Sequence, residues 1–160
     1  MLRRQVFLAK MTSMPAPPVF PPIGLRLSRT AHAVSQAFER AMAEAGGSAS
    51  SWQVLLLVRT QQWGNQSQMA EALGITGATL THHLNAMEKQ GLVRRWREES
   101  NRRVQRVELT PEGEAMFERL RGVAMAHDAR LREGFTEDEL AQLAALLDRL
   151  KTSVETSPAP

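Results

Sequence analysis

The sequence predicts a mainly α-helical protein that carries one small β-hairpin. Apolar residues recur every three or four positions over most of the chain, as they do along one face of an amphipathic helix. Between residues 92 and 109 this spacing gives way to two short strand-like segments rich in arginine. The expected order of elements is four helices, two strands and two further helices, within a single domain that covers residues 23–154.

Both ends of the chain are expected to lie outside this domain. Residues 1–22 are predicted to form a flexible, proline-rich tail, because proline breaks helices and favours extended backbone. The prolines concerned are Pro15, Pro17, Pro18, Pro21 and Pro22. Residues 155–160 are polar, end in proline and are expected to form a frayed tail.

A long first helix is predicted from an apolar stripe that stops at Gly46-Gly47. The members of the stripe are Ile23, Leu27, Ala31, Val34, Phe38, Ala41 and Met42. Ser50 and Gln53, three residues apart, resemble a capping box at the start of the next helix. That second helix is short and should be buried, because residues 54–58 are almost all apolar.

Two short helices joined by a tight turn are predicted next. Asn65 and Gln68 repeat the capping signal, and Gly74 suits the left-handed position that ends a helix. Thr76 then caps the second of the pair, which Gly91 ends. The inward-facing residues are Met69, Ala70 and Leu73 in the first helix and Leu80, Leu84 and Met87 in the second. This is the pattern of a helix-turn-helix, whose second helix enters the major groove of DNA.

The hairpin and the last two helices complete the chain. Leu92-Val93 and Val104–Leu109 are predicted as strands around a turn at Glu98–Arg103, with a small third strand considered near Trp63. Thr110-Pro111 marks a helix start. The apolar stripe of that helix contains Met116, Leu120 and Val123. After Gly134, Thr136 and Glu139 form a capping box for a last helix with a coiled-coil-like seam. The seam consists of Leu140, Leu143, Leu147, Leu150 and Val154.

The free face of the second helix of the helix-turn-helix carries small or hydrogen-bonding side chains. These candidate DNA-binding residues are Gly77, Ala78, Thr79, Thr81, His82 and Asn85. Gly77 and Ala78 would let a phosphate approach the helix N-terminus, whose amide groups favour an anion. Thr81 and His82 are expected to reach base edges or phosphates. Asn85 either pairs with adenine or makes a local hydrogen bond within the protein.

Arginine is concentrated in the hairpin. The net charge of the chain is only +3, but six arginines lie between residues 94 and 106. A local basic patch of this kind matters more for phosphate binding than the total charge does. Arg94, Arg95 and Arg97 are expected to contact phosphates, with Arg102 in the same patch, and Arg103 is the candidate for a minor-groove contact. A hairpin of this kind on its own fits a solvated charged surface equally well. The adjacent helix-turn-helix favours the interpretation as a DNA-binding surface.

Several other functions find no support in the sequence. The chain has no cysteine, which excludes disulfides, thiolate catalysis and cysteine–zinc sites and fits a reducing cytoplasm. No apolar run approaches the roughly 20 residues that span a membrane. Nucleophile elbows, glycine-rich phosphate loops and metal-binding motifs are missing from the sequence. The sequence therefore predicts a cytoplasmic protein that is not an enzyme and has no cofactor, metal or membrane attachment.

Three stretches together resemble the winged helix-turn-helix of the MarR family of bacterial transcription regulators: SSWQVLLLV, QSQMAEALGITGATLTHHLNAMEKQGLVRR and NRRVQRVELTPEG. The resemblance extends over about residues 23–154. It implies a DNA-binding lobe at 50–109 and dimerisation helices at 23–46 and 111–154. It also implies an obligate homodimer whose reading helices enter successive major grooves while wing arginines enter minor grooves.

Two residues depart from the family pattern. Asn101 stands at the wing position where the family has aspartate, and it can form a hydrogen bond but cannot pair charge. The alternatives are a looser wing or a wing in which Glu98 or Glu99 takes the place of the aspartate. His82 stands where the family often has arginine, which changes the expected base preference. Because histidine titrates near neutrality, DNA binding is expected to be sensitive to pH at roughly 6 to 7.

The resemblance also implies a small aromatic or phenolic effector, bound between the dimerisation helices and the DNA-binding lobe. The candidate residues in this chain are His32, Gln36, Trp52 and Arg59. Plain core packing is the alternative for Trp52, and a position on the surface or in the core is the alternative for His32.

The predicted function is that of a sequence-specific transcription regulator of double-stranded DNA, acting as a ligand-responsive repressor that binds a palindromic operator as a homodimer. The alternative is a winged helix that binds DNA without specificity or serves only protein contacts. Salt titration against matched and scrambled duplexes would distinguish these functions.

Overall fold

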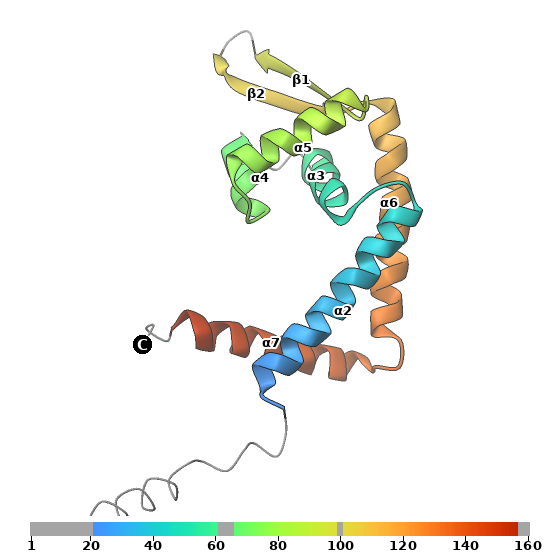
Figure 1. Cartoon of the computed structure of the whole chain (residues 1–160), viewed down its shortest axis with the longest axis vertical. Helices are drawn as coiled ribbons and strands as arrows, with labels where there is room; N and C mark the ends of the chain where they lie inside the picture. The colour runs from blue at the N-terminus through green and yellow to red at the C-terminus, as the bar shows by residue number, and fades with distance from the viewer. Residues whose placement is uncertain (1–20, 61–65, 99–100, 157–160) are drawn as a thin grey trace, which may run out of the picture. The chain divides into compact units, whose positions relative to one another are not determined.

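The computed structural model describes residues 21–60, 66–98 and 101–156, without the side chains of residues 97–98 and 101–105 (Figure 1). Its elements are α2 (Ile23–Glu44), α3 (Ala49–Thr60), α4 (Gln66–Ala72), α5 (Gly77–Lys89), β1 (Val93–Glu98), β2 (Asn101–Leu109), α6 (Pro111–Arg132) and α7 (Glu137–Glu155). This order confirms the predicted mainly helical fold with one antiparallel hairpin. The tail up to residue 20, the third strand near Trp63 and the cap at Asn65 fall outside the described residues.

Contacts along the chain divide it into two units, residues 1–37 and 38–160. Helix α2 passes from one unit into the other. In the first unit, Ile23, Leu25 and Leu27 of α2 are exposed. The second unit contains the end of α2 and all the later elements, and the buried core described below belongs to it.

The turn between α2 and α3 corrects one prediction. Ser48, rather than Ser50, caps α3, because Ser51 N donates to Ser48 Oγ at 3.0 Å and Ser48 N donates to Ser51 Oγ at 2.8 Å. Two serines three residues apart thus satisfy each other's backbone amide. This pairing caps the helix as a capping box would, but without the glutamate or glutamine that the sequence signal requires. Gly46 adopts a φ of 82°, as predicted for the glycine pair that ends α2.

One hydrophobic core joins the end of α2 to α3, α4, α5, the base of β1 and α6. Its buried residues are Met42, Val54, Leu55, Val58, Met69, Ala70, Leu80, Leu84, Met87, Leu92, Val93, Phe117 and Leu120. The predicted inward faces of α4 and α5 are confirmed. Phe117 was missing from the predicted stripe of α6, and its ring stacks on Trp52 at a centroid distance of 5.4 Å. Leu56 faces solvent, so the apolar run in α3 is only partly buried.

The turn between α4 and α5 sets the start of α5. Gly74 ends α4 with a φ of 65°, and Ile75 N donates back to Ala70 O at 3.0 Å. Thr76 caps α5 by accepting a hydrogen bond from Thr79 N at 3.1 Å. The chain can reverse direction here in four residues, and α4 and α5 therefore form the predicted helix-turn-helix.

The base of the hairpin is fastened to the start of α6. Thr110 N donates to Leu92 O at 3.1 Å, and Thr110 Oγ1 accepts from Gly113 N at 3.0 Å. Gly113 is buried, and a Cβ on it would lie 1.9 Å from Leu92 O. Only glycine fits this position, because any side chain would collide with the backbone of Leu92, just before β1.

Helix α7 begins with the predicted capping box. Thr136 N donates to Glu139 Oε2 at 2.8 Å, and Glu139 N donates to Thr136 Oγ1 at 3.3 Å. The hydrogen bond from the Thr136 backbone holds the pKa of the Glu139 carboxyl below its usual value. No residue of α7 is buried, and Leu143 and Leu147 of the predicted seam are exposed. None of the helices in the described parts of the chain combines the length and hydropathy that crossing a bilayer requires.

Replacing Gly113 with alanine is expected to lower the free energy of unfolding by about 1–3 kcal/mol or more, because the added Cβ must displace the Leu92 carbonyl. The matched control is Gly122→Ala in the same helix, where an added Cβ meets no atom within 4 Å. The control should gain about 0.5–1 kcal/mol from the higher helix propensity of alanine. Urea unfolding at one protein concentration measures both, and equal stabilities for the two variants would contradict this account of the junction.

Candidate nucleic-acid interface

Helix α5 presents two chemically different faces. Leu80, Leu84 and Met87 are buried against the core, which fixes the rotation of the helix. The opposite face is exposed and carries the predicted reading residues Gly77, Ala78, Thr79, Thr81, His82 and Asn85. A helix anchored on one side with small and polar side chains on the other is what major-groove reading requires.

The N-terminal turn of α5 is open. Gly77 and Ala78 are exposed, and a Cβ built on Gly77 would meet no atom within 4 Å. Thr76 Oγ1 and Thr79 Oγ1 lie 2.9 Å apart in a hydrogen bond, so these hydroxyls serve the cap. The remaining amide groups of this turn are available to an anion such as a phosphate.

Two side chains in the middle of α5 have defined settings. The Thr81 hydroxyl donates to Gly77 O at 2.8 Å, and the exposed side chain can still accept a hydrogen bond through its oxygen. His82 is exposed, and its ring centroid lies 6.2 Å from that of the half-buried His83. His82 is therefore accessible to a ligand on the exposed face of α5.

The first strand of the hairpin holds an exposed arginine–tryptophan pair. The Arg94 guanidinium lies 5.7 Å from the centre of the Trp96 ring, and Arg94 Nε donates to Glu108 Oε1 at 2.7 Å across the hairpin. The Arg94 side chain remains 71% exposed despite this ion pair, so it can still contact a phosphate. The sequence prediction missed Trp96 and Glu108. The signal for Trp96 was the alternation in VRRWRE, which puts Arg94 and Trp96 on one face of the strand. Glu108 is placed by the strand pairing, which sets it opposite Arg94.

Arg95 points the other way and contacts α5. Its Nε donates to Glu88 Oε2 at 3.0 Å and its Nη2 donates to Asn85 Oδ1 at 2.6 Å, with a further bond from Nη2 to Glu88. Hydrogen bonding from Arg95 holds the pKa of the Glu88 carboxyl below its usual value. The predicted phosphate contact of Arg95 therefore has a competing partner inside the protein. The local hydrogen bond expected as one alternative for Asn85 is observed.

The tip of the hairpin differs from the predicted turn at Glu98–Arg103. Strand β1 continues to Glu98 and β2 begins at Asn101, so the strands extend into residues that were assigned to the turn. The charged side chains in the sequence indicated a loop here, but the backbone hydrogen bonds that pair two strands form independently of side-chain polarity. The register shifts here, because Arg97 pairs with Gln105 and Glu98 pairs with Asn101. The side chains of the candidates Arg97, Arg102 and Arg103 lie outside the description.

The predicted effector residues differ in burial and in their contacts. In the first unit, His32 and Gln36 are exposed on α2. In the second unit, Trp52 packs against the core and stacks on Phe117, and Arg59 forms an ion pair with Glu114 at 3.1 Å. Trp52 thus has the packing that its core alternative expects, and its part in effector binding stays a prediction.

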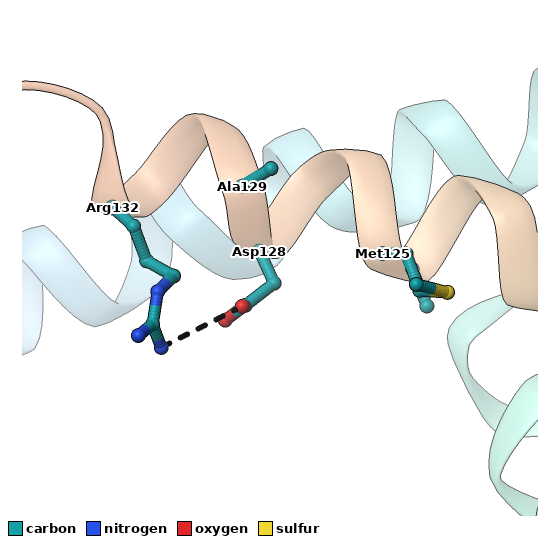
Figure 2. Close-up of a pocket in the computed structure, with 5 residues that line it drawn as sticks. Met125, Asp128, Ala129 and Arg132 are labelled. Carbon is teal, nitrogen blue, oxygen red and sulfur yellow. Dashed lines mark ion pairs between the residues drawn. The ribbon is translucent and has the colours of Figure 1, made fainter.

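An open hollow of about 580 Å³ lies along α6 and was not predicted from the sequence (Figure 2). Its lining residues are Ala124, Met125, Asp128, Ala129 and Arg132. Asp128 and Arg132 form an ion pair at 3.9 Å at one end. Next to these residues on α6, His127 Nε2 is buried without a hydrogen-bond partner, and its ring lies 5.1 Å from that of Phe38. Within the described ranges, no cluster of three or more histidine, aspartate or glutamate side chains could hold a metal ion.

Comparisons with known proteins agree on the fold. The model of the MarR family matches residues 48–104. The transcriptional repressor CouR bound to a 23-mer DNA duplex is 30% identical, with a TM-score of 0.72 over 81% of this chain and 92% of that chain. CouR from Rhodococcus jostii RHA1 bound to p-coumaroyl-CoA is 27% identical, with a TM-score of 0.68 over 86% and 95%. The S. aureus MepR–DNA complex shares the fold, with a TM-score of 0.75 over 84% and 99% at 21% identity.

The Glu88–Arg95 ion pair predicts an acid-sensitive contribution to stability. Because the pKa of Glu88 is lowered in the folded chain, its contribution is complete at neutral pH. This contribution to stability should begin to decrease when the pH drops below the ordinary glutamate pKa of roughly 4.3. It should vanish once the pH drops below the pKa of Glu88 in the folded chain. Glu88→Gln should therefore be less stable than wild type at pH 7, with the difference shrinking toward pH 3.

Urea midpoints measured from pH 7 to pH 3 test this dependence. Glu71→Gln, which neutralises an exposed carboxylate on α4, is the control and should follow the wild-type curve. A Glu88→Gln difference that stays constant across the pH range would show that the carboxylate charge does not contribute.

Proposed function

Because this chain belongs to the MarR family of transcription regulators, we propose that it acts as a ligand-responsive repressor that binds a palindromic operator as a homodimer. The observation that carries the proposal is the pair of faces on α5. One face is locked into the core by Leu80, Leu84 and Met87, and the other offers accessible polar groups beside an arginine-rich hairpin. A solvated structural helix has no need of so many small side chains on its free face.

The two parts of this surface have different tasks. Thr81, His82 and Asn85 on α5 read base edges, while the amides around Gly77 and the exposed Arg94 fix the register on phosphates. Arg97, Arg102 and Arg103 extend the basic patch toward the hairpin tip, where Arg103 enters the minor groove. The DNA-bound CouR structure, at 30% identity, supports this use of the lobe.

Apolar surface on α7 supports the homodimer. Leu143 and Leu147 are 44% and 42% exposed, although they belong to a seam with the three- and four-residue spacing of a helix contact. A monomer rarely leaves such a stripe unpacked. We assign the stripe to a second copy of the chain, which would present two reading helices about 34–36 Å apart, one turn of DNA.

The effector is proposed to be a small aromatic or phenolic compound. The CouR structure with p-coumaroyl-CoA, whose acyl group is phenolic, supports this class of ligand. Such a ligand lowers operator affinity only as far as it binds the DNA-free form more tightly than the DNA-bound form. The candidate contacts remain His32, Gln36, Trp52 and Arg59, of which Trp52 is also packed against the core.

Selection of bound duplexes from a random pool tests the proposed function. A palindrome with half-sites about one helical turn apart is the expected product. The specificity ratio against a scrambled duplex should be roughly 10³ or more at physiological salt. Equal binding of both duplexes would favour a non-specific DNA-binding module, and no binding to either would favour a protein-interaction module.

Replacing Arg103 with alanine is expected to weaken binding of the selected duplex by at least about 5-fold without loss of fold, because one charged contact is removed. Arg130→Ala, which removes the same charge from an exposed position in α6, is the control and should bind as wild type does. A fluorescence titration, with circular dichroism of each variant, gives the comparison. Equal affinities for Arg103→Ala and wild type would remove this arginine from the interface.

The double replacement Leu143→Asp with Leu147→Asp should convert the dimer to monomer, because charges buried without partners are costly. Sedimentation velocity at micromolar concentration measures the state. Glu137→Gln with Asp138→Gln, at the exposed start of the same helix, is the control and should remain dimeric. A dimer that survives the two aspartates would place the contact elsewhere on the chain.

A further inference from the structure

Three polar side chains form a fixed bridge between the reading helix and the hairpin. Arg95 of β1 reaches Glu88 and Asn85, which lie three residues apart on α5 and therefore on the same side of the helix. The Arg95 side chain is only 14% exposed, whereas that of its neighbour Arg94 is 71% exposed. Arg95 is thus enclosed between the two elements, while Arg94 is open to solvent.

The bridge determines which end of the Asn85 amide faces solvent. Arginine has only hydrogen-bond donors, so the group that meets Arg95 Nη2 at 2.6 Å must be the amide oxygen. The Asn85 amide nitrogen, which is donor-only, is then directed away from the arginine. Asn85 is exposed on the reading face, so its NH₂ group is the part that a base edge can meet.

The charge of Arg95 is already paired with a carboxylate of the protein itself. Both its Nε and its Nη2 donate to Glu88 Oε2, so a carboxylate occupies the position that a phosphate would take. A guanidinium paired in this way, and mostly enclosed, releases no counterion from DNA when the complex forms. Arg95 and Arg94, adjacent in sequence, should therefore affect DNA binding in different ways.

We propose that Arg95, held by Glu88, is a positioning residue that makes Asn85 a hydrogen-bond donor in base reading, so that the base opposite Asn85 is guanine rather than adenine. Guanine presents two adjacent acceptors, N7 and O6, in the major groove, which match the two hydrogens of an NH₂ group. Adenine presents an acceptor beside a donor, and pairing with both requires the amide oxygen, which the hydrogen bond from Arg95 holds toward β1. This inference rests on the proposed sequence-specific DNA binding.

The test uses the full-length dimer and the duplex selected by the wild-type chain. Asn85→Ala identifies the base pair that Asn85 contacts, as the position where discrimination is lost. In wild type that position should prefer guanine to adenine by roughly 10-fold, the scale of one good base contact. Arg95→Met should remove this preference and move it toward adenine, while the other positions and the salt dependence stay unchanged.

Arg94→Met is the matched control on the same strand. It should weaken all duplexes uniformly and reduce the slope of log affinity against log salt by about one per protomer, without changing any base preference. A second variant, Asn85→Asp, changes only an exposed residue and so preserves the fold. A carboxylate accepts from Arg95 and has no donor to offer, so guanine should be lost and cytosine, whose N4 donates, should be favoured.

Three results would overturn the inference. Adenine at the Asn85 position in the wild-type duplex would show that the amide oxygen reads the base. A reduced salt slope for Arg95→Met would show that Arg95 contacts phosphate, as first predicted from the sequence. A uniform loss of affinity for Arg95→Met that Arg95→Lys restores, with no change of base preference, would show a purely structural bridge. Failure to select any duplex would instead overturn the proposed function together with this inference.

Discussion

The close approach of Gly113 to the Leu92 carbonyl fixes the base of the hairpin against the start of α6. Leu92 is the last core residue before β1, and Gly113 lies in the first turn of α6, so this contact closes the loop formed by both strands. The Thr110 hydrogen bonds to the same region fix the angle at which the chain leaves the hairpin. Without glycine at 113, either α6 or the Leu92 backbone would have to shift, which would disturb the packing of Phe117 and Leu120 on the same helix.

With the base of the hairpin fixed, successive side chains of β1 point to opposite faces of the strand. Arg94 and Trp96 share one face and remain accessible, and Arg95 turns to the other face and meets α5. A single strand thereby supplies both an exposed basic surface and hydrogen bonds that hold α5. The rotation of α5 is determined twice, by its buried apolar stripe and by the polar bridge to Glu88 and Asn85.

Most of the fold follows from local signals that are present in the sequence. Glycines at 46, 74, 91 and 134 adopt positive φ, and Thr76, Thr110 and Thr136 cap the helices that they were expected to cap. The start of α3 was misplaced because Ser48 and Ser51 cap each other without the usual acidic partner. The Arg95 bridge could not be predicted, because seven residues and a helix end separate it from Glu88, and only the folded register brings them together. Strand pairing at the hairpin tip was missed for the same reason, since pairing depends on the opposite strand.

Two of the three tryptophans stand in contrasting surroundings. Trp52 is stacked on Phe117 within the core, whereas Trp96 is 41% exposed beside Arg94. Trp52 and Trp96 are thus two intrinsic optical probes that report different events. Emission from Trp52 reports the integrity of the folded core, and a soluble quencher reaches Trp96 before it reaches Trp52. A variant that retains only Trp96 would therefore signal, without any attached dye, when a large ligand covers the hairpin.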